Sequence, residues 1–92
     1  MNATKAHLEL LHSLPCVVDF LLLGKRTKPV QVHHLESVRD ELSDFAAIPI
    51  SVYWHTELHR LSRREFERKT KLTPIDLLAG TIQLLMESVP KP

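Results

Sequence analysis

Four of the six histidines lie between residues 30 and 60, in a spacing that suits a metal ion. His55 and His59 are four residues apart, so on a helix both imidazoles leave the same face, with Cβ atoms about 5–6 Å apart. His33 and His34 are adjacent, and adjacent residues of a strand point to opposite faces of the sheet. One of them can therefore face the helix while the other has a different role. Because imidazole is a common metal ligand, the pattern predicts a divalent ion held between a strand end and a helix.

Two short strands and a helix are expected to position these histidines. Residues 30–32 alternate between valine and glutamine, which is typical of a strand, and lead directly into His33. Residues 46–52 are apolar and predict a second strand, which Pro49 places at a sheet edge or ends early. Ser51 is a suitable N-cap for the helix that follows. The order strand, strand, helix predicts a β-β-α unit that brings the first strand's end beside the helix.

Further elements are expected around this unit. An N-terminal helix over about 3–14 is ended by Pro15. Residues 16–23 are apolar and partly β-branched and predict a buried strand, followed by a basic turn over 24–29. Apolar residues at steps of three and four over 35–45 predict a short helix between the two strands.

The C-terminal part, about residues 62–89, is predicted to be helical. Ser62 and Thr73 are suitable N-caps, Glu65 stands at the capping-box position, and Pro74 suits the first position of the last helix. One apolar stripe runs along that helix at steps of three and four, with Met86 beside it: Ile75, Leu78, Ile82, Leu85 and Val89. Such a stripe forms either core or an oligomer seam, and we expect it in the core.

Composition limits the class of protein. The 92 residues are enough for one domain, and 43% apolar with 25% charged residues favours a folded chain over a disordered one. The single cysteine excludes an intrachain disulfide. No apolar run is long enough for a bilayer, and no basic segment precedes an apolar one as in a signal peptide, so we expect a cytoplasmic protein without a membrane partner. The elements predict a small α+β domain, a short antiparallel hairpin flanked by an N-terminal helix and C-terminal helices.

The order of these residues resembles the His-Asn-His (HNH) endonuclease superfamily, over roughly residues 16–72. The shared motif consists of His33-His34, a gap of twenty residues and the pair His55-x-x-x-His59. The shared flanking residues are Ile48-Pro49-Ile50, Arg60 and Phe66-Glu67. The likeness is greatest to compact phage-encoded members related to recombination nucleases. It implies a ββα-metal core over about 16–61 in one domain spanning 1–92, encoded by a phage or prophage and acting in a bacterial or phage-infected cell.

The resemblance also implies site residues and an activity. His33, His55 and His59 would bind one divalent ion, Mg²⁺, Mn²⁺ or Zn²⁺, and His34 would be the general base. The reaction would be phosphodiester hydrolysis that yields a 5′-phosphate and a 3′-hydroxyl. A carboxylate that orients a ligand imidazole is expected, and Asp44 or Glu57 would supply it.

The chain departs from the family pattern in two ways. Family members often hold a structural zinc between two Cys-x-x-Cys-like pairs, whose positions here read Cys16, Asp19, Ser51 and Trp54. One thiolate cannot complete such a site, so we expect no structural zinc, and apolar packing by Trp54, Phe20 and the N-terminal helix instead.

The motif asparagine also has no counterpart, because the only asparagine is Asn2. Asp44 is the nearest polar candidate to assist His34 in its place.

Nucleic-acid binding would depend on local charge, because the net charge is only +1. Candidate phosphate contacts are Lys25, Arg26 and Lys28 in the basic turn, and Arg60, Arg63, Arg64 and Arg68, with Lys69 and Lys71, after the metal-binding helix. The alternatives are an ordinary solvated loop and a solvated helix balanced by Glu65 and Glu67.

Two functions from different classes follow. The first is a small metal-dependent endonuclease acting on DNA rather than RNA. The second is a catalytically degenerate HNH-fold binding protein, such as a phage inhibitor that docks on a host nucleoprotein complex or nuclease. Either function is compatible with a phage or host protein as a partner.

Overall fold

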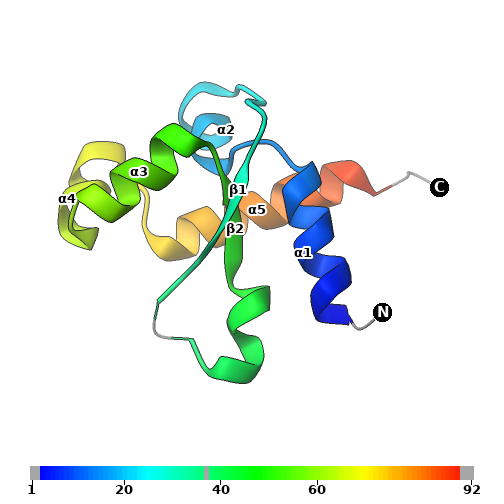
Figure 1. The fold of residues 1–92 in the computed structure, drawn as a ribbon. Coiled ribbons are helices and arrows are strands. Elements are labelled where there is room, and N and C mark those ends of the chain that lie inside the picture. Colours follow the sequence, from blue (N-terminus) through cyan, green and yellow to red (C-terminus); the bar gives the residue numbers. More distant parts are fainter. Residues whose placement is uncertain (1–2, 37, 90–92) are drawn as a thin grey trace.

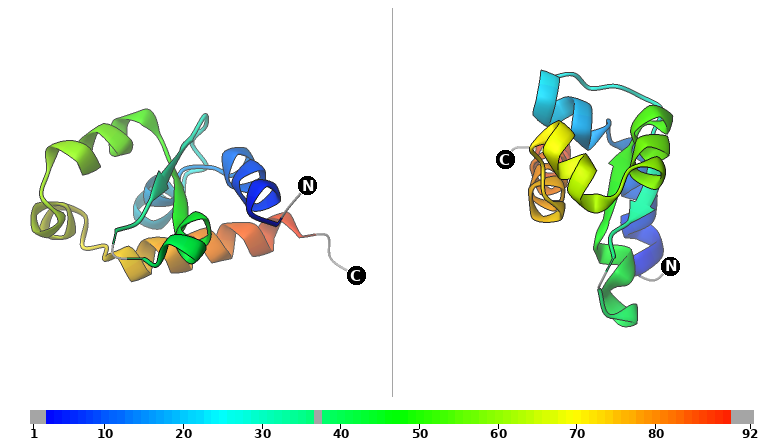
Figure 2. Two further views of the ribbon diagram at one scale, coloured as in Figure 1. Left: turned by 60° about the horizontal axis from the view of Figure 1, so that its bottom comes forward. Right: turned by 90° about the vertical axis from the view of Figure 1, so that its left-hand side faces the viewer.

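An antiparallel pair of short strands, β1 (Gln31–His34) and β2 (Ala47–Ile50), lies at the centre of the fold (Figure 1). Their register pairs Gln31 with Ile50 and His33 with Ile48. All four residues of β2 are buried, because α1, α2, α3 and α5 pack around it, whereas β1 is more exposed. Figure 2 shows α5 crossing beneath the hairpin and α3 with α4 forming an arm at one side.

The computed structural model describes residues 3–36 and 38–89, and Asn2 lies outside this part of the chain. The helices are α1 (Ala3–Ser13), α2 (Val17–Leu23), the 3₁₀ helix η1 (Asp40–Phe45), α3 (Val52–Arg60), α4 (Arg63–Thr70) and α5 (Pro74–Ser88). The domain is thus mostly helical with one two-stranded sheet, which confirms the α+β class in its broad form.

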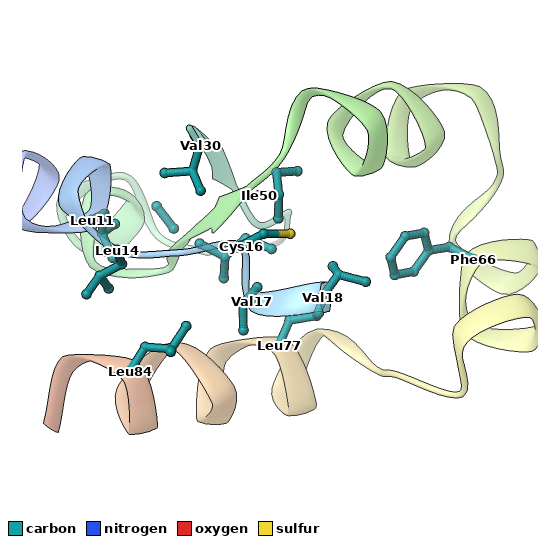
Figure 3. Close-up of a cluster of buried hydrophobic side chains, with 12 residues drawn as sticks. Leu11, Leu14, Cys16, Val17, Val18, Val30, Ile50, Phe66, Leu77 and Leu84 are labelled. Atoms are coloured by element: carbon teal, nitrogen blue, oxygen red, sulfur yellow. The ribbon is translucent and has the colours of Figure 1, made fainter. Parts of the chain in front are cut away.

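The core gathers apolar side chains from every part of the chain (Figure 3). Its buried members are Leu11, Leu14, Cys16, Val17, Val18, Val30, Ala47, Ile48, Ile50, Phe66, Leu77 and Leu84. Phe20 and Trp54 are partly buried and pack against this cluster, as expected.

The strand predicted over residues 16–23 is wrong, because Val17–Leu23 is helix α2. An apolar run this short has no period that separates a buried strand from a buried helix. Gly24 decides the end of the segment. Its φ of 67° is left-handed, its N–H donates to the Phe20 carbonyl, and the N–H of Lys25 donates to the Asp19 carbonyl, which closes a helix and not a strand.

Pro49 sits within β2, opposite Val32. A two-stranded sheet leaves one edge of each strand unpaired, so the missing N–H of proline is tolerated there. The expectation of an edge strand is therefore confirmed.

The expected caps begin the later helices. The Ser51 hydroxyl accepts a hydrogen bond from a backbone N–H in the first turn of α3. Ser62 and Thr73 form full capping boxes, with Glu65 at the start of α4 and Asp76 at the start of α5.

The helix predicted over residues 35–45 is only partly present, since η1 covers just Asp40–Phe45. A 3₁₀ turn makes poorer hydrogen bonds than an α-helix and stays short. The Phe45 ring contacts the ring of His7 in α1, with centroids 5.2 Å apart, and so ties this turn to the N-terminal helix.

The apolar stripe expected to be buried in α5 is largely exposed. Ile75 is 79% exposed and Ile82 and Val89 are each 53% exposed, while Leu78 and Leu85 are partly buried. The buried face is instead formed by Leu77, Gly80, Thr81 and Leu84.

Gly80 and Thr81 explain why this face was missed. Gly80 has no side chain, which lets α5 approach α2 closely at Leu21 and Val17. The Thr81 hydroxyl donates to the Leu77 carbonyl at 2.9 Å, so a polar residue is satisfied within the helix and can be buried. A helix that is apolar on two faces shows two apolar stripes in its sequence, and close packing against a neighbouring helix decides which of them is buried.

Among the described residues no single helix is long and apolar enough to cross a membrane. Only α1 and α2 taken together, bent by 46° at their junction, meet the criteria of length and composition.

The close approach of α2 and α5 predicts that Gly80→Ala destabilises the fold. An added Cβ would lie 2.8 Å from both Leu21 Cδ1 and Val17 Cγ2. Better helix propensity gains about 1 kcal/mol, but overpacking typically costs about 1–3 kcal/mol. We expect a net loss of about 1 kcal/mol in the free energy of unfolding, measured in urea.

The control is Gln83→Ala on the exposed face of the same helix, for which no loss is expected. A Gly80→Ala protein more stable than the wild type would contradict the close packing.

Candidate metal centre

The hairpin and α3 bring His33, His55 and His59 together as a histidine triad. One nitrogen from each side chain lies within 4.8 Å of the others. The ring centroids are 5.2 Å apart for His33 and His55, 5.5 Å for His33 and His59, and 4.7 Å for His55 and His59. The structure therefore brings together the three residues that the sequence predicted as ligands.

This convergence follows from the local structure. Only Ser51 separates the end of β2 from the start of α3, so the helix leaves the hairpin at once. The register places His33 opposite Ile48, close to this junction. His55 and His59 share the helix face that turns back toward β1, as their spacing predicts.

Gln31 orients one of the triad histidines. Its Oε1 lies 2.6 Å from Nδ1 of His55, and because an amide oxygen can only accept, His55 Nδ1–H is the donor. The lone pair of His55 Nε2 is then left for a metal ion. Sequence reasoning missed Gln31, although its position two residues before His33 places both on one face of the strand.

Burial and mutual repulsion favour the neutral form of the His33 and His55 imidazoles. Desolvation is the largest cause that lowers the pKa of His33, and repulsion from His55 and His59 lowers it further. Burial, followed by repulsion from His59, lowers the pKa of His55 as well. Neutral imidazole is the form that binds metal, so protons compete less with a metal ion for these two side chains than they would for histidines of ordinary pKa.

The donor set fits a divalent transition ion. Three imidazoles are a typical catalytic zinc set, which leaves a further coordination position open. Mg²⁺ prefers oxygen ligands, so among the ions expected from the sequence the triad favours Zn²⁺.

His34 pairs with Asp44 beside the triad. Its Nε2 lies 2.8 Å from Asp44 Oδ1, and both side chains are partly exposed. A carboxylate accepts, so His34 Nε2–H donates to it and Nδ1 is left to take a proton. Asp44 reaches this position because it stands in η1, just before the Ala47 that pairs with His34 in the sheet.

Glu57 does not orient a ligand imidazole. It is only 8% exposed and accepts hydrogen bonds from Arg60 Nε and Nη2, at 3.2 and 2.8 Å, and from Lys69 Nζ at 3.0 Å. These bonds, led by the one from Arg60, lower the pKa of Glu57 to about 2. The carboxylate therefore joins α3 to α4.

Several predicted phosphate contacts already have acidic partners. Arg60 and Lys69 bind Glu57, and Arg63 lies 3.5 Å from Glu67. Ion pairs within the fold reduce the charge that these side chains offer to a phosphate backbone.

The basic turn is held toward α5. Arg26 Nη2 donates to Glu87 at 2.7 Å, and its guanidinium also lies over the ring of Phe20. Lys25 and Lys28, which flank Arg26 in the sequence, are exposed. Arg64 and Arg68 in α4 are exposed as well. None of these five cations lines the pocket that holds His33, His34 and His59, whereas Arg63 does.

The four positions compared with zinc ligands have other roles. Trp54 Nε1–H donates to Asp19 Oδ1 at 2.8 Å, which links α3 to α2. Cys16 is fully buried, and Ser51 caps α3. The Trp54 ring also meets the Phe66 ring edge to face, with centroids 5.9 Å apart.

The triad predicts binding of one Zn²⁺ per chain, measured by calorimetry. Loss of the orienting hydrogen bond in Gln31→Leu is expected to weaken binding by roughly 10–100-fold, and loss of a ligand in His59→Ala to weaken it more. His12→Ala, which alters an exposed histidine of α1, is the control and should bind as the wild type does. Equal affinities for all four proteins would refute the site.

The ion pairs of Glu57 predict a stability difference that depends on pH. Because the folded-state pKa is about 2, below the ordinary 4.5, the stabilisation is complete above pH 4.5 and is lost as the pH falls toward 2. Glu57→Gln should therefore be less stable than the wild type at pH 7, with a gap that narrows in this window in urea titrations.

The exposed Glu9→Gln in α1 is the matched control and should show no such gap. A gap of constant size from pH 7 to pH 2 would contradict the ionic origin of the effect.

Compared with models of protein families, with curated proteins and with solved structures, the chain finds no match in any of the three. Its function is therefore inferred from the residues of the site.

Proposed function

We propose that this chain is a metal-dependent nuclease of the HNH type that hydrolyses phosphodiester bonds in DNA. One observation carries the proposal: His33, His55 and His59 offer nitrogens within 4.8 Å of one another, while His34 stands next to them with a carboxylate partner. A metal-binding triad with an adjacent oriented base supplies a Lewis acid and a general base, which together can catalyse hydrolysis of a phosphodiester.

The residues divide the work between binding and proton transfer. The triad would hold one divalent ion, which when bound supplies Lewis-acid stabilisation of charge on the phosphate. His34 Nδ1 accepts the proton of the attacking water. Asp44 holds the His34 ring in place and stabilises its charged form, as the acid does in other His–Asp pairs.

Asp44 supports the proposal where the motif departs from the family. The asparagine of the motif assists the base in the family that the chain resembles, and no asparagine occurs after Asn2. The 2.8 Å hydrogen bond from His34 to Asp44 gives the base an orienting partner of another kind.

A second candidate is a degenerate HNH-fold protein that binds without cleaving, such as a phage inhibitor of a host nucleoprotein complex or nuclease. The internal ion pairs of Arg60, Arg63 and Lys69, together with a net charge of only +1, favour it, since they limit attraction to a phosphate backbone.

The test is cleavage of supercoiled plasmid and of circular single-stranded DNA with Mg²⁺, Mn²⁺ or Zn²⁺. The wild type should cleave at least one of them. His34→Ala should lose about 10²–10⁴-fold in rate while still binding metal, because only general-base assistance is removed. His12→Ala is again the matched control and should keep the full rate.

Two results would count against the proposal. Full activity in His34→Ala would show that this histidine is not the base. A folded protein that binds Zn²⁺ and cleaves neither DNA would instead favour the binding function.

A further inference from the structure

A pocket of about 560 Å³ adjoins the histidine triad. Its walls come from β1, the end of α3, α4 and the start of α5, and half of its lining residues are apolar, including Leu58, Leu61, Phe66 and Leu72. Phe66 is buried, at 2% exposure. The volume falls in the range of about 300–1,000 Å³ that is usual for sites of small organic ligands.

The pocket and the proposed reaction site share residues. His33 and His59 of the triad line it, and so does the proposed base His34. Arg63 and Glu67 of α4 also line the pocket, with Arg63 Nε 3.5 Å from Glu67 Oε1. A group bound in the pocket therefore lies directly beside the atoms proposed to act on a phosphate.

The chemistry of the lining narrows the ligand. The imidazoles, Ser62 and Arg63 on the lining suit a phosphate, but a phosphate would lose its hydration without gaining partners against the leucine and phenylalanine side chains, so the apolar part of the pocket suits another group. A flat heteroaromatic ring suits the pocket, because its faces are apolar and its edge can exchange hydrogen bonds with Arg63 and Glu67. In a nucleic acid such a ring is joined to each phosphate through one sugar.

We infer that this pocket receives the nucleobase of the nucleotide whose phosphate lies at the triad. The inference rests on the proposed nuclease function and adds a substrate class to it. Bases of an intact duplex are stacked and paired, and cannot enter a pocket without being unstacked and extruded. The substrate is therefore single-stranded nucleic acid or an unpaired nucleotide in a duplex.

The first experiment presents one end-labelled DNA strand in three forms: alone, in a perfect duplex, and in a duplex with a one-nucleotide bulge. The free strand and the bulge should be cut at least tenfold faster than the perfect duplex. Cleavage of all three forms at one rate would overturn the inference while leaving the nuclease function intact.

The second experiment removes single bases from the free strand. An abasic residue at one fixed position next to the cut should weaken binding at least tenfold, and abasic residues elsewhere should not. Binding is measured by gel shift with His34→Ala, so that the strand stays whole. If no abasic position matters, the pocket does not hold a base.

The third experiment fills the pocket. Leu61→Trp places a larger ring in the lining, and is expected to weaken binding of the strand at least tenfold and to abolish the abasic effect, with Zn²⁺ affinity unchanged. Leu23→Trp, at the exposed end of α2, is the matched control and should change neither. Leu72→Trp is a second filling variant, used if Leu61→Trp does not fold.

The binding readout separates the two proposals. A protein that cleaves no DNA can still show the abasic effect and lose that effect when the pocket is filled. That result would support the base site and refute the nuclease function. The base site is refuted if the folded protein binds no single-stranded DNA. It is also refuted if a folded filling variant binds the strand as the wild type does.

Discussion

The candidate site depends on the way α3 leaves β2. One residue joins them, and its hydroxyl caps the helix, so the direction of α3 is fixed by the strand before it. The strand in turn is fixed by burial of Ile48 and Ile50 under the helices. A register slip of one residue would turn His33 to the other face of β1 and separate it from His55. Core packing thus sets the geometry of the triad.

The second constraint is electrostatic. The buried carboxylate of Glu57 binds Arg60 from α3 and Lys69 from α4, which fixes the arm on which half of the pocket is built. Both cations are exposed, and the pairs offset part of their positive charge at the surface. Affinity for a nucleic acid then depends less on the phosphate backbone and more on groups that a pocket can enclose, which agrees with a site for an unpaired base.

The sequence predicted most reliably what local chemistry decides. Helix starts at Ser51, Ser62 and Thr73 follow from hydroxyl caps, and the pairing of His55 with His59 follows from helical spacing alone. These features need no knowledge of distant parts of the chain.

Features set by tertiary packing were harder to predict. The segment Val17–Leu23 is helical because it packs on α5, and the buried face of α5 is chosen by the close contact at Gly80. Glu57 was expected as a possible partner for a histidine, but it binds Arg60 in its own helix and Lys69 in α4, and the position of α4 beside α3 is set by tertiary packing. The pocket likewise combines residues from β1, α3, α4 and α5, which no single motif contains.

The contact between His7 and Phe45 gives the N-terminal helix a part in the site, although α1 carries none of its residues. Phe45 is the neighbour of Asp44, so the ring contact anchors the turn from which that carboxylate reaches His34. The two proposed tasks of the site would therefore have separate supports: metal binding would depend on the strand-to-helix junction, and alignment of the proposed base on the first helix. Damage to α1 would then disturb the proposed proton transfer and leave the histidine triad in place.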